Sequence, residues 1–279
     1  MSTYVSEQRE QWNAAAAMWR KWAPQVDAAA AHISRRLVEL AEIGPGDRVL
    51  DVGAGQGEPA LEAARRVAPH GRVVATDISP EMLAVARERA ADAGLDNLEF
   101  VESDAAALDF PPATFDAALS RWGIIFEQDP EAVAARIRTF LKPRGAMAIA
   151  SWGPVERVPM SGIPRRVIAE RLEIAPSPEG EPGPFARTTP EALGSLLEGG
   201  GFSEIQVEEA EVAFELESPE QFTAYVQDMS PRTRRLMADR PQEEQDALWD
   251  AITDAVRAEA DASGRVRLSN QALLAAGRA

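Results

Sequence analysis

Short apolar runs alternate with amphipathic stretches through the middle of the chain. In the amphipathic stretches apolar residues recur with helical spacing, and one stretch begins with Ser79 as N-cap and Pro80 at the first helical position. Strands that alternate with helices in this way predict a parallel sheet with helices on both faces. The expected strands lie at 47–52, 72–77, 98–103, 115–120 and 146–152.

The pattern differs before and after this region. Residues 7–40 predict two helices that are broken at Pro24. A proline- and glycine-rich stretch follows the predicted sheet, and after it come a strand at 203–216 and a helical block from 219 to about 262. We expect the run ALLAA (272–276) to form a strand beside 203–216, although the same run equally suits a helix.

The composition narrows the class of protein. With 279 residues, 45% of them hydrophobic, the chain can form a sizeable core. It has no cysteine and only two histidines, which lie far apart in sequence, so we expect no metal site. A net charge of -16 without a basic cluster disfavours nucleic acid as a partner. The N-terminus resembles no signal peptide and no run is apolar enough to span a bilayer, so we expect a cytoplasmic protein without membrane insertion.

The first predicted strand ends in a glycine loop, VLDVGAGQGE (49–58). The dinucleotide fingerprint places a third glycine where this chain has Glu58. In such sites an acid at the end of the next strand, about 20 residues further on, binds both ribose hydroxyls, and Asp77 lies at that point. The loop therefore predicts a nucleoside cofactor and leaves open what its 5′ end carries.

Three carboxylates lie around this loop in the predicted sheet: Asp51, Glu58 and Asp104. At about 4 Å each would oppose a pyrophosphate by roughly 1–4 kcal/mol, depending on the local dielectric. The same charges would attract a nucleoside that carries a cation. S-adenosylmethionine is such a molecule, because it bears a sulfonium and an α-ammonium.

Five segments resemble, in order and spacing, the motifs of class I S-adenosylmethionine-dependent methyltransferases, particularly the group similar to the ubiquinone/menaquinone C-methyltransferases. The segments are VLDVGAGQG, ATDIS, ESDA, FDAALSRWGIIF and LKPRGAMAIASW, the last with Arg144 in place of a usual glycine. The resemblance implies a Rossmann-like α/β fold. Its seven-stranded, mostly parallel sheet would have helices on both faces and an antiparallel last strand, with N-terminal helices and a helical cover added.

This fold divides the chain into a core and several additions. The expected parts are an N-terminal helical cap (1–43), a cofactor-binding core (44–152), a lid or insertion (153–188), the end of the core sheet (189–216), a helical insertion (217–263) and the terminal strand (264–279).

The resemblance also implies contacts, carried over residue by residue. In that picture Asp51 lies near the methionine ammonium, Asp77 binds the ribose, and Asp104 accepts from the adenine amino group. The implied cofactor residues are Asp51, Gly53, Gly55, Gln56, Asp77, Ile78, Met82, Asp104, Ala105 and Ser120. The expected substrate-lining residues are Trp19, Arg121, Trp122, Phe126, Trp152 and Tyr225. For each aromatic residue in this set, packing in the core is the alternative.

The expected reaction is displacement at the sulfonium methyl by a small-molecule acceptor, through O, N or C. Alignment alone can contribute about 7–11 kcal/mol to such a reaction, so we assign no catalytic base. A quinone-ring C-methyltransferase is one alternative function. A non-catalytic S-adenosylmethionine-binding sensor or scaffold is another, and the sequence leaves both monomer and homodimer open.

Overall fold

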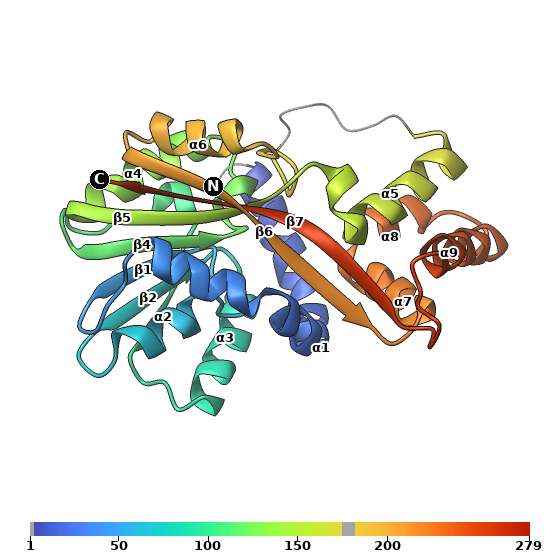
Figure 1. The fold of residues 1–279 in the computed structure, drawn as a ribbon, viewed down its shortest axis with the longest axis horizontal. Coiled ribbons are helices and arrows are strands. Elements are labelled where there is room, and N and C mark those ends of the chain that lie inside the picture. Colours follow the sequence, from blue (N-terminus) through green and yellow to red (C-terminus); the bar gives the residue numbers. More distant parts are fainter. Residues whose placement is uncertain (1–2, 175–181) are drawn as a thin grey trace.

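The computed structural model describes residues 3–174 and 182–279 and contains a seven-stranded sheet with helices on both faces (Figure 1). The strand order is β3-β2-β1-β4-β5-β7-β6. This arrangement confirms the predicted Rossmann-like α/β fold. The strands are β1 (Arg48–Val52), β2 (Arg72–Asp77), β3 (Leu98–Glu102), β4 (Phe115–Arg121), β5 (Leu141–Trp152), β6 (Ser203–Leu216) and β7 (Val266–Arg278).

The strands β1 to β5 are parallel, so their carboxyl ends meet at one edge of the sheet. Strand β7 lies between β5 and β6 and is antiparallel to both. The run 272–276 is therefore a strand and not a helix. Its side chains are buried on both faces, and a strand buried in this way has a continuous apolar run instead of an alternating one.

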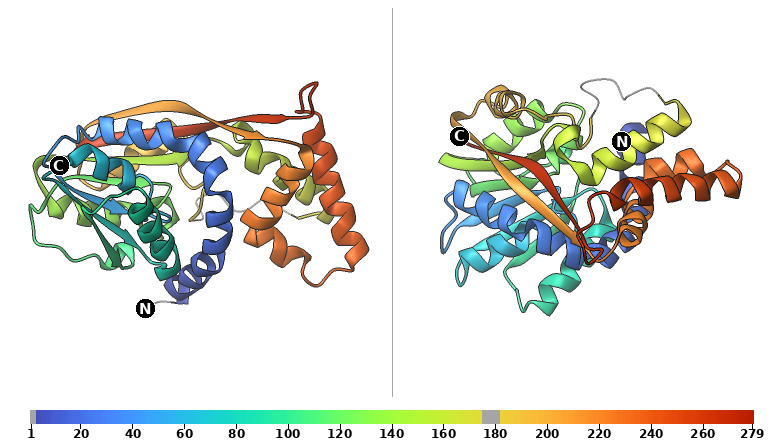
Figure 2. Two further views of the ribbon diagram at one scale, coloured as in Figure 1. Left: turned by 90° about the horizontal axis from the view of Figure 1, so that it is seen from below. Right: turned by 45° about the vertical axis from the view of Figure 1, so that its right-hand side comes forward.

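Two layers of helices cover the sheet (Figures 1 and 2). One face packs against α4 (Pro130–Phe140) and α6 (Pro190–Gly199), and the other against α2 (Ala60–Val67), α3 (Pro80–Asp92) and the C-terminal half of α1 (Thr3–Leu40). A further group of helices lies where the paired strands β6 and β7 extend beyond the other strands. It contains α5 (Pro159–Leu172), α7 (Pro219–Met229), α8 (Pro231–Met237) and α9 (Gln242–Arg257).

Helix α1 is continuous from Thr3 to Leu40 and contains Pro24. The expectation of two helices separated by a break at Pro24 was therefore wrong. A proline inside a helix removes one backbone hydrogen bond and favours a bend, and α1 is visibly bent in Figure 2. Both halves bury apolar side chains, among them Ala16 before the proline and Ile33 after it. Tertiary packing of this kind keeps a helix intact despite a poor residue.

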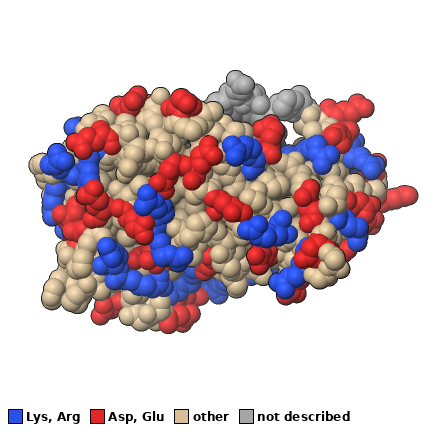
Figure 3. Space-filling model, viewed as in Figure 1, with Lys and Arg blue, Asp and Glu red and all other residues tan. Residues whose placement is uncertain are grey.

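The segment expected to form a lid, 153–188, contains the short 3-10 helix η3 (Val155–Arg157) and α5, while residues 175–181 lie outside the described residues. None of the described helices is long and apolar enough to cross a bilayer. Acidic and basic side chains intermix across the face shown in Figure 3.

Candidate active site

A cavity of about 760 Å³ opens at the carboxyl edge of the sheet. Helix α1 covers it on one side, and α5, α7 and α8 enclose its far end. Fourteen predicted site residues line it: Trp19, Gly53, Gly55, Gln56, Asp77, Ile78, Met82, Asp104, Ala105, Arg121, Trp122, Phe126, Trp152 and Tyr225. Two predicted residues, Asp51 and Ser120, lie behind the cavity wall.

The glycine loop makes a close contact with the turn after β4. Gly53 has φ +72, and a Cβ added to it would lie 2.8 Å from the Cα of Gly123. Only glycine allows both this backbone conformation and this approach. The contact brings the ends of β1 and β4 together and fixes the floor of the cavity.

Four backbone amides of the loop already have acceptors within the protein. Gly53 and Ala54 both donate to the carbonyl oxygen of Thr76 at 2.9 Å, and Gly55 donates to Oδ2 of Asp77 at 2.8 Å. Gly57 donates to the carbonyl oxygen of Ala54 at 2.8 Å. Phosphate-binding loops instead direct free amides at their ligand. The geometry therefore gives an independent argument against a pyrophosphate.

Asp77 holds the loop and also lines the cavity. Its Oδ1 accepts from the amide of Ser79 at 2.8 Å, while Oδ2 accepts from Gly55. Burial raises the pKa of this carboxyl, and these amide donors oppose the rise. Each carboxylate oxygen can accept more than one hydrogen bond, so Asp77 can still receive two hydroxyl donors from a ligand.

Asp104 lies next to this position, at the end of β3. It caps the 3-10 helix η1 (Ala105–Ala107), because its Oδ1 accepts from the amide of Ala106 at 3.2 Å. Met82 and Ile78 complete this part of the cavity from the start of α3 and the end of β2. The four side chains form a compartment with one apolar and one acidic wall.

Asp51 is not among the residues that line the cavity, and its predicted contact with a cofactor stays a prediction. Its side chain is fully buried, and its Oδ2 accepts from the amide of Ala60 at 2.9 Å. Ala60 is the first residue of α2, which was expected to begin near Gln56. Asp51 therefore satisfies an orphan amide at the start of α2. Burial raises the pKa of Asp51 to about 8.

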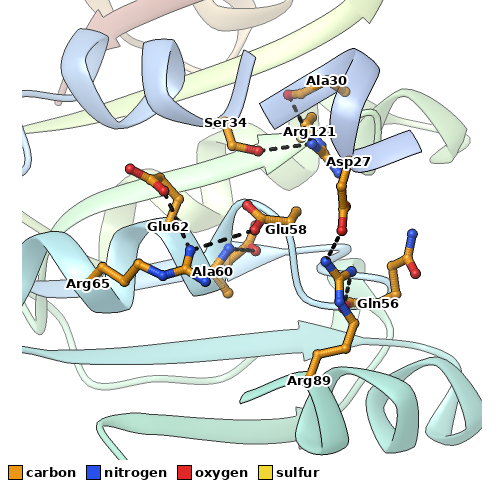
Figure 4. Close-up of polar contacts among 11 residues, drawn as sticks. Asp27, Ala30, Ser34, Gln56, Glu58, Ala60, Glu62, Arg65, Arg89 and Arg121 are labelled. Atoms are coloured by element: carbon orange, nitrogen blue, oxygen red, sulfur yellow. Dashed lines mark hydrogen bonds and ion pairs between the residues drawn. The ribbon is translucent and has the colours of Figure 1, made fainter. Parts of the chain in front are cut away.

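Glu58 and Arg121 line the cavity wall near the glycine loop (Figure 4). Arg121 donates through Nη1 to the Ser34 hydroxyl at 2.9 Å and to the Ala30 carbonyl at 3.3 Å, both on α1. Burial lowers the pKa of Arg121 and raises that of Glu58. Arg121 and Ser34 both act to lower the pKa of the Glu58 carboxyl. The replacement of the third glycine by Glu58 was the sequence signal for this group.

Polar atoms at this end of the cavity are buried without a hydrogen-bond partner among the described residues. They are Oε2 of Glu58, Nε of Arg121 and both amide atoms of Gln56. Nearby, Arg89 joins Asp27 of α1 to the carbonyl oxygen of Gln56. Buried groups of this kind are costly when unpaired, so the arrangement suits a ligand with complementary charges.

Ser120 makes two hydrogen bonds within the protein, and its predicted contact with the cofactor stays a prediction. Its hydroxyl donates to the carbonyl oxygen of Val52 at 2.7 Å and accepts from the amide of Ile124 at 3.0 Å. Both bonds are buried, and they tie the turn after β4 to the end of β1. Ser120 supports the floor of the cavity from behind.

Aromatic side chains form the other half of the cavity. Trp122 and Trp152 stack with ring centroids 4.4 Å apart and an interplanar angle of 7°. On α1, Trp12 packs edge-on against Phe126 at 5.2 Å and lies 6.5 Å from Trp19. The sequence placed Trp12 on the same helix face as Trp19 but could not show that Trp12 reaches Phe126 after β4.

A contact between α1 and α7 closes this half from above. Oδ2 of Asp228 accepts from Lys21 Nζ at 2.6 Å and from Trp22 Nε1 at 2.8 Å. Trp22 also packs edge-on against Tyr225 at 5.2 Å. Asp228 was not predicted, because a single acid in a helical insertion carries no sequence signal for such a contact.

Glu127 is another lining residue that the prediction did not include. Burial raises the pKa of its carboxyl to about 7, and the nearby charge of Asp104 contributes. Tyr4 closes over it, since the Tyr4 hydroxyl donates to the carbonyl oxygen of Phe126. Among the described residues there is no cluster of acids or histidines suited to a metal ion.

Known proteins resemble this chain most clearly through its core. Residues 49–145 match the family model described as a methyltransferase domain. An uncharacterised protein of Mycobacterium tuberculosis is 38% identical over 138 residues, which cover 49% of each chain. The ubiquinone/menaquinone biosynthesis C-methyltransferase UbiE of Teredinibacter turnerae is 37% identical over 116 residues, 41% of this chain and 47% of that protein.

Aklanonic acid methyltransferase DauC of Streptomyces sp. (strain C5) is 36% identical over 119 residues, 43% of this chain and 54% of that protein. The chain thus spans about half the length of the curated relatives it matches.

Among solved structures, the YcgJ protein of Bacillus subtilis has a TM-score of 0.56 at 17% identity, covering 89% of this chain and 98% of that one. The [4+2]-cyclase SpnF has a TM-score of 0.56 at 20% identity, and the match covers 93% of this chain and 94% of that one. These structures share the fold.

Proposed function

We propose that the protein methylates a small-molecule acceptor. The premise is that residues 49–145 form a class I S-adenosylmethionine-dependent methyltransferase domain. The methyl group would pass from S-adenosylmethionine to O, N or C of the acceptor. One observation carries the proposal: a single cavity joins the acidic compartment of Asp77 and Asp104 to the aromatic half around Trp122 and Trp152. A nucleoside cofactor and an apolar acceptor would meet where the two halves join.

The residues present fit this cofactor. Asp77 can accept from the two ribose hydroxyls, and Asp104 from the adenine amino group, with Met82 against the ring. At the opposite end Glu58 and Arg121 offer buried atoms of opposite charge without partners, which suit the ammonium and carboxylate of the methionine moiety. The loop amides, already engaged by Thr76 and Asp77, would not hold a phosphate.

When bound, S-adenosylmethionine supplies a methyl group activated by its sulfonium. The protein then has to align the acceptor and exclude water, and alignment alone can contribute about 7–11 kcal/mol. Helix α1 and the aromatic side chains provide the exclusion. Tyr225 is no base at neutral pH, because burial raises its pKa. Asp228 already accepts from Lys21 and Trp22. These contacts support catalysis by positioning.

A quinone-ring acceptor is the second candidate. The relative named UbiE is a ubiquinone/menaquinone C-methyltransferase, and the aromatic half of this cavity would suit a planar ring. A non-catalytic cofactor-binding protein is the alternative of another class. A panel of phenols, quinones and amines separates these candidates, with the methylated atom identified by mass spectrometry and NMR. Binding of the cofactor with no methylated product from the whole panel would favour the sensor or scaffold.

Calorimetric titration with S-adenosylhomocysteine tests the cofactor site directly. We expect Asp77→Ala to lose at least about tenfold in affinity, since two charge-assisted hydrogen bonds to the ribose disappear. The control is Asp109→Ala, whose side chain is 93% exposed and only pairs with Arg136 at 3.8 Å. Equal affinities for wild type and Asp77→Ala would refute the nucleoside assignment.

A further inference from the structure

Trp122 has an unusual backbone conformation at the junction of the two halves of the cavity. Its φ is +57, in the left-handed region that bulky side chains rarely adopt. The residue directly follows β4, and its amide donates to the carbonyl oxygen of Ala150 at 3.1 Å. Residues held in such conformations concentrate at ligand sites, so the placement of this side chain calls for a functional explanation.

Two neighbours fix the Trp122 indole. Trp152 stacks on it at 4.4 Å and 7°, and the guanidinium carbon of Arg121 lies over the same ring at 5.1 Å from its centroid. Both groups pack on the indole and restrain its orientation.

The edge of the Trp122 ring carries a hydrogen-bond donor, Nε1, that has no acceptor in the described part of the chain. Nε1 of Trp122 is buried and has no partner among the described residues. An indole nitrogen can only donate, and a buried unpaired donor is unfavourable. The buried guanidinium of Arg121 over the ring adds positive potential. An oxygen atom that bears negative charge is the partner this edge favours.

The position of Trp122 relates this donor to the proposed reaction. The next residue, Gly123, touches Gly53 of the glycine loop, so Trp122 adjoins the methionine end of the cofactor site. On the far side the wall is apolar, with Met160, Ile168 and Phe214 among its members. An acceptor that fits both features is a planar apolar ring system with one ionisable oxygen.

We propose that Nε1 of Trp122 donates a hydrogen bond to the anionic oxygen of a phenolate or enolate acceptor, with Arg121 and Trp152 holding the indole in place. This inference rests on the proposed function and assigns its acceptor class. It also accounts for the lack of an assigned base, because an acceptor bound as its anion needs no proton removed at the moment of transfer.

The test uses 7-hydroxycoumarin, a planar phenol whose neutral and anionic forms absorb at different wavelengths. Bound to the wild-type protein with S-adenosylhomocysteine, the probe is expected to ionise at lower pH than in water. Trp122→Phe keeps a stacking ring and removes the donor. We expect this variant to raise the ionisation midpoint of the bound probe by about one pH unit, a tenfold loss of preference for the anion.

Met160→Leu is the matched control, since it alters the apolar wall of the cavity but keeps Nε1 of Trp122 and the two side chains that hold the indole. It is expected to weaken both forms of the probe alike and to leave the midpoint unchanged. A midpoint that is the same in wild type and Trp122→Phe overturns the inference. So does a Trp122→Phe variant that loses S-adenosylhomocysteine affinity while keeping the midpoint, because the donor would then serve the cofactor carboxylate.

A comparison within the wild-type protein covers the case in which Trp122→Phe does not fold. 7-Methoxycoumarin has the same ring but cannot ionise. Above the ionisation midpoint the hydroxy compound is expected to bind at least about tenfold more tightly, and equal affinities contradict the inference. Failure of the wild-type protein to bind S-adenosylhomocysteine would instead refute the proposed function.

Discussion

At the scale of single residues, the two acids that flank the glycine loop have different tasks. Asp51 lies behind the loop and caps α2, while Glu58 reaches the cavity. The sequence shows both acids beside the glycines and predicts a negative environment correctly. It could not distinguish their roles, because the start of α2 at Ala60 depends on how the loop folds.

Asp51→Asn tests the buried carboxyl. The pKa of Asp51 is raised from 3.8 to about 8 by burial, so the folded protein resists its ionisation. The stability that this raised pKa contributes is fully present below pH 3.8 and is lost as the pH rises through about 8. Asparagine keeps an acceptor for the Ala60 amide and has no charge to bury.

We therefore expect Asp51→Asn to be increasingly more stable than wild type from pH 4 towards pH 8, by on the order of 1.4 kcal/mol per pH unit at most. Urea unfolding of both proteins at several pH values measures the difference. A stability difference that does not vary with pH would contradict the assignment.

Glu58→Gln tests the group that reaches the cavity. Loss of this negative charge is expected to reduce S-adenosylhomocysteine affinity by about tenfold, because the ligand ammonium loses a charge-assisted partner. Glu62→Gln is the control, since Glu62 also pairs with Arg65, at 3.5 Å, but lies away from the cavity. Calorimetry on the three proteins decides the matter, and equal loss in both variants would point to a general charge effect.

At the scale of elements, α1 links parts of the fold that the sequence pattern treats separately. Its N-terminal half packs on Met82 and Phe126, and its C-terminal half lies on the sheet. The contact of Asp228 with Lys21 and Trp22 joins it to α7. Apolar periodicity predicted that these helices exist. Their meeting over one cavity depends on long-range packing that periodicity does not encode.

Asp228→Asn is expected to loosen the contact between α1 and α7. The amide keeps one acceptor oxygen but loses the charge that Lys21 pairs with. We expect S-adenosylhomocysteine to dissociate several-fold faster with little change in the free energy of unfolding, because exposed ion pairs contribute about 0–1 kcal/mol. Stopped-flow fluorescence measures the rate. Asp254→Asn on α9 is the control, and a rate equal to wild type in Asp228→Asn would exclude a closing role.

The contact between the turns after β1 and β4 makes a second prediction at this scale. Gly53→Ala would place a Cβ 2.8 Å from the Cα of Gly123, whereas Gly55→Ala, also at positive φ, meets nothing within 4 Å. We expect both variants to lose stability, with Gly53→Ala losing about 1–3 kcal/mol more. Denaturant unfolding compares the pair, and equal losses would mean that the turns can separate freely.

At the scale of the whole molecule, the sequence predicted the sheet well because parallel strands buried on both faces leave continuous apolar runs. The seven strands and the antiparallel β7 agree with the expectation from the family resemblance. The predicted break in α1 and the predicted start of α2 near Gln56 were wrong. Both depend on which backbone amides and apolar surfaces find partners across the fold.

The central position of β7 can be tested within one strand. Leu274 is fully buried between β5 and β6, whereas Ser269 on the same strand is exposed. Leu274→Glu is expected to destabilise the protein by several kcal/mol, since it buries an unpaired charge, while Ser269→Glu changes stability by less than about 0.5 kcal/mol. Similar unfolding midpoints for the two variants would contradict the observed sheet order.

The insertion of β7 between β5 and β6 also constrains the order in which the chain can fold. Residues 203–216 form an edge strand whose neighbour is β7, so they have no partner in the sheet until residues 266–278 arrive. The segment that forms α7, α8 and α9 lies between these two strands in the sequence and is synthesised before β7. Such distant pairing slows folding and leaves strand edges open meanwhile. Synthesis on the ribosome would thus complete the β1–β5 half of the sheet long before the half that carries the helices over the cavity.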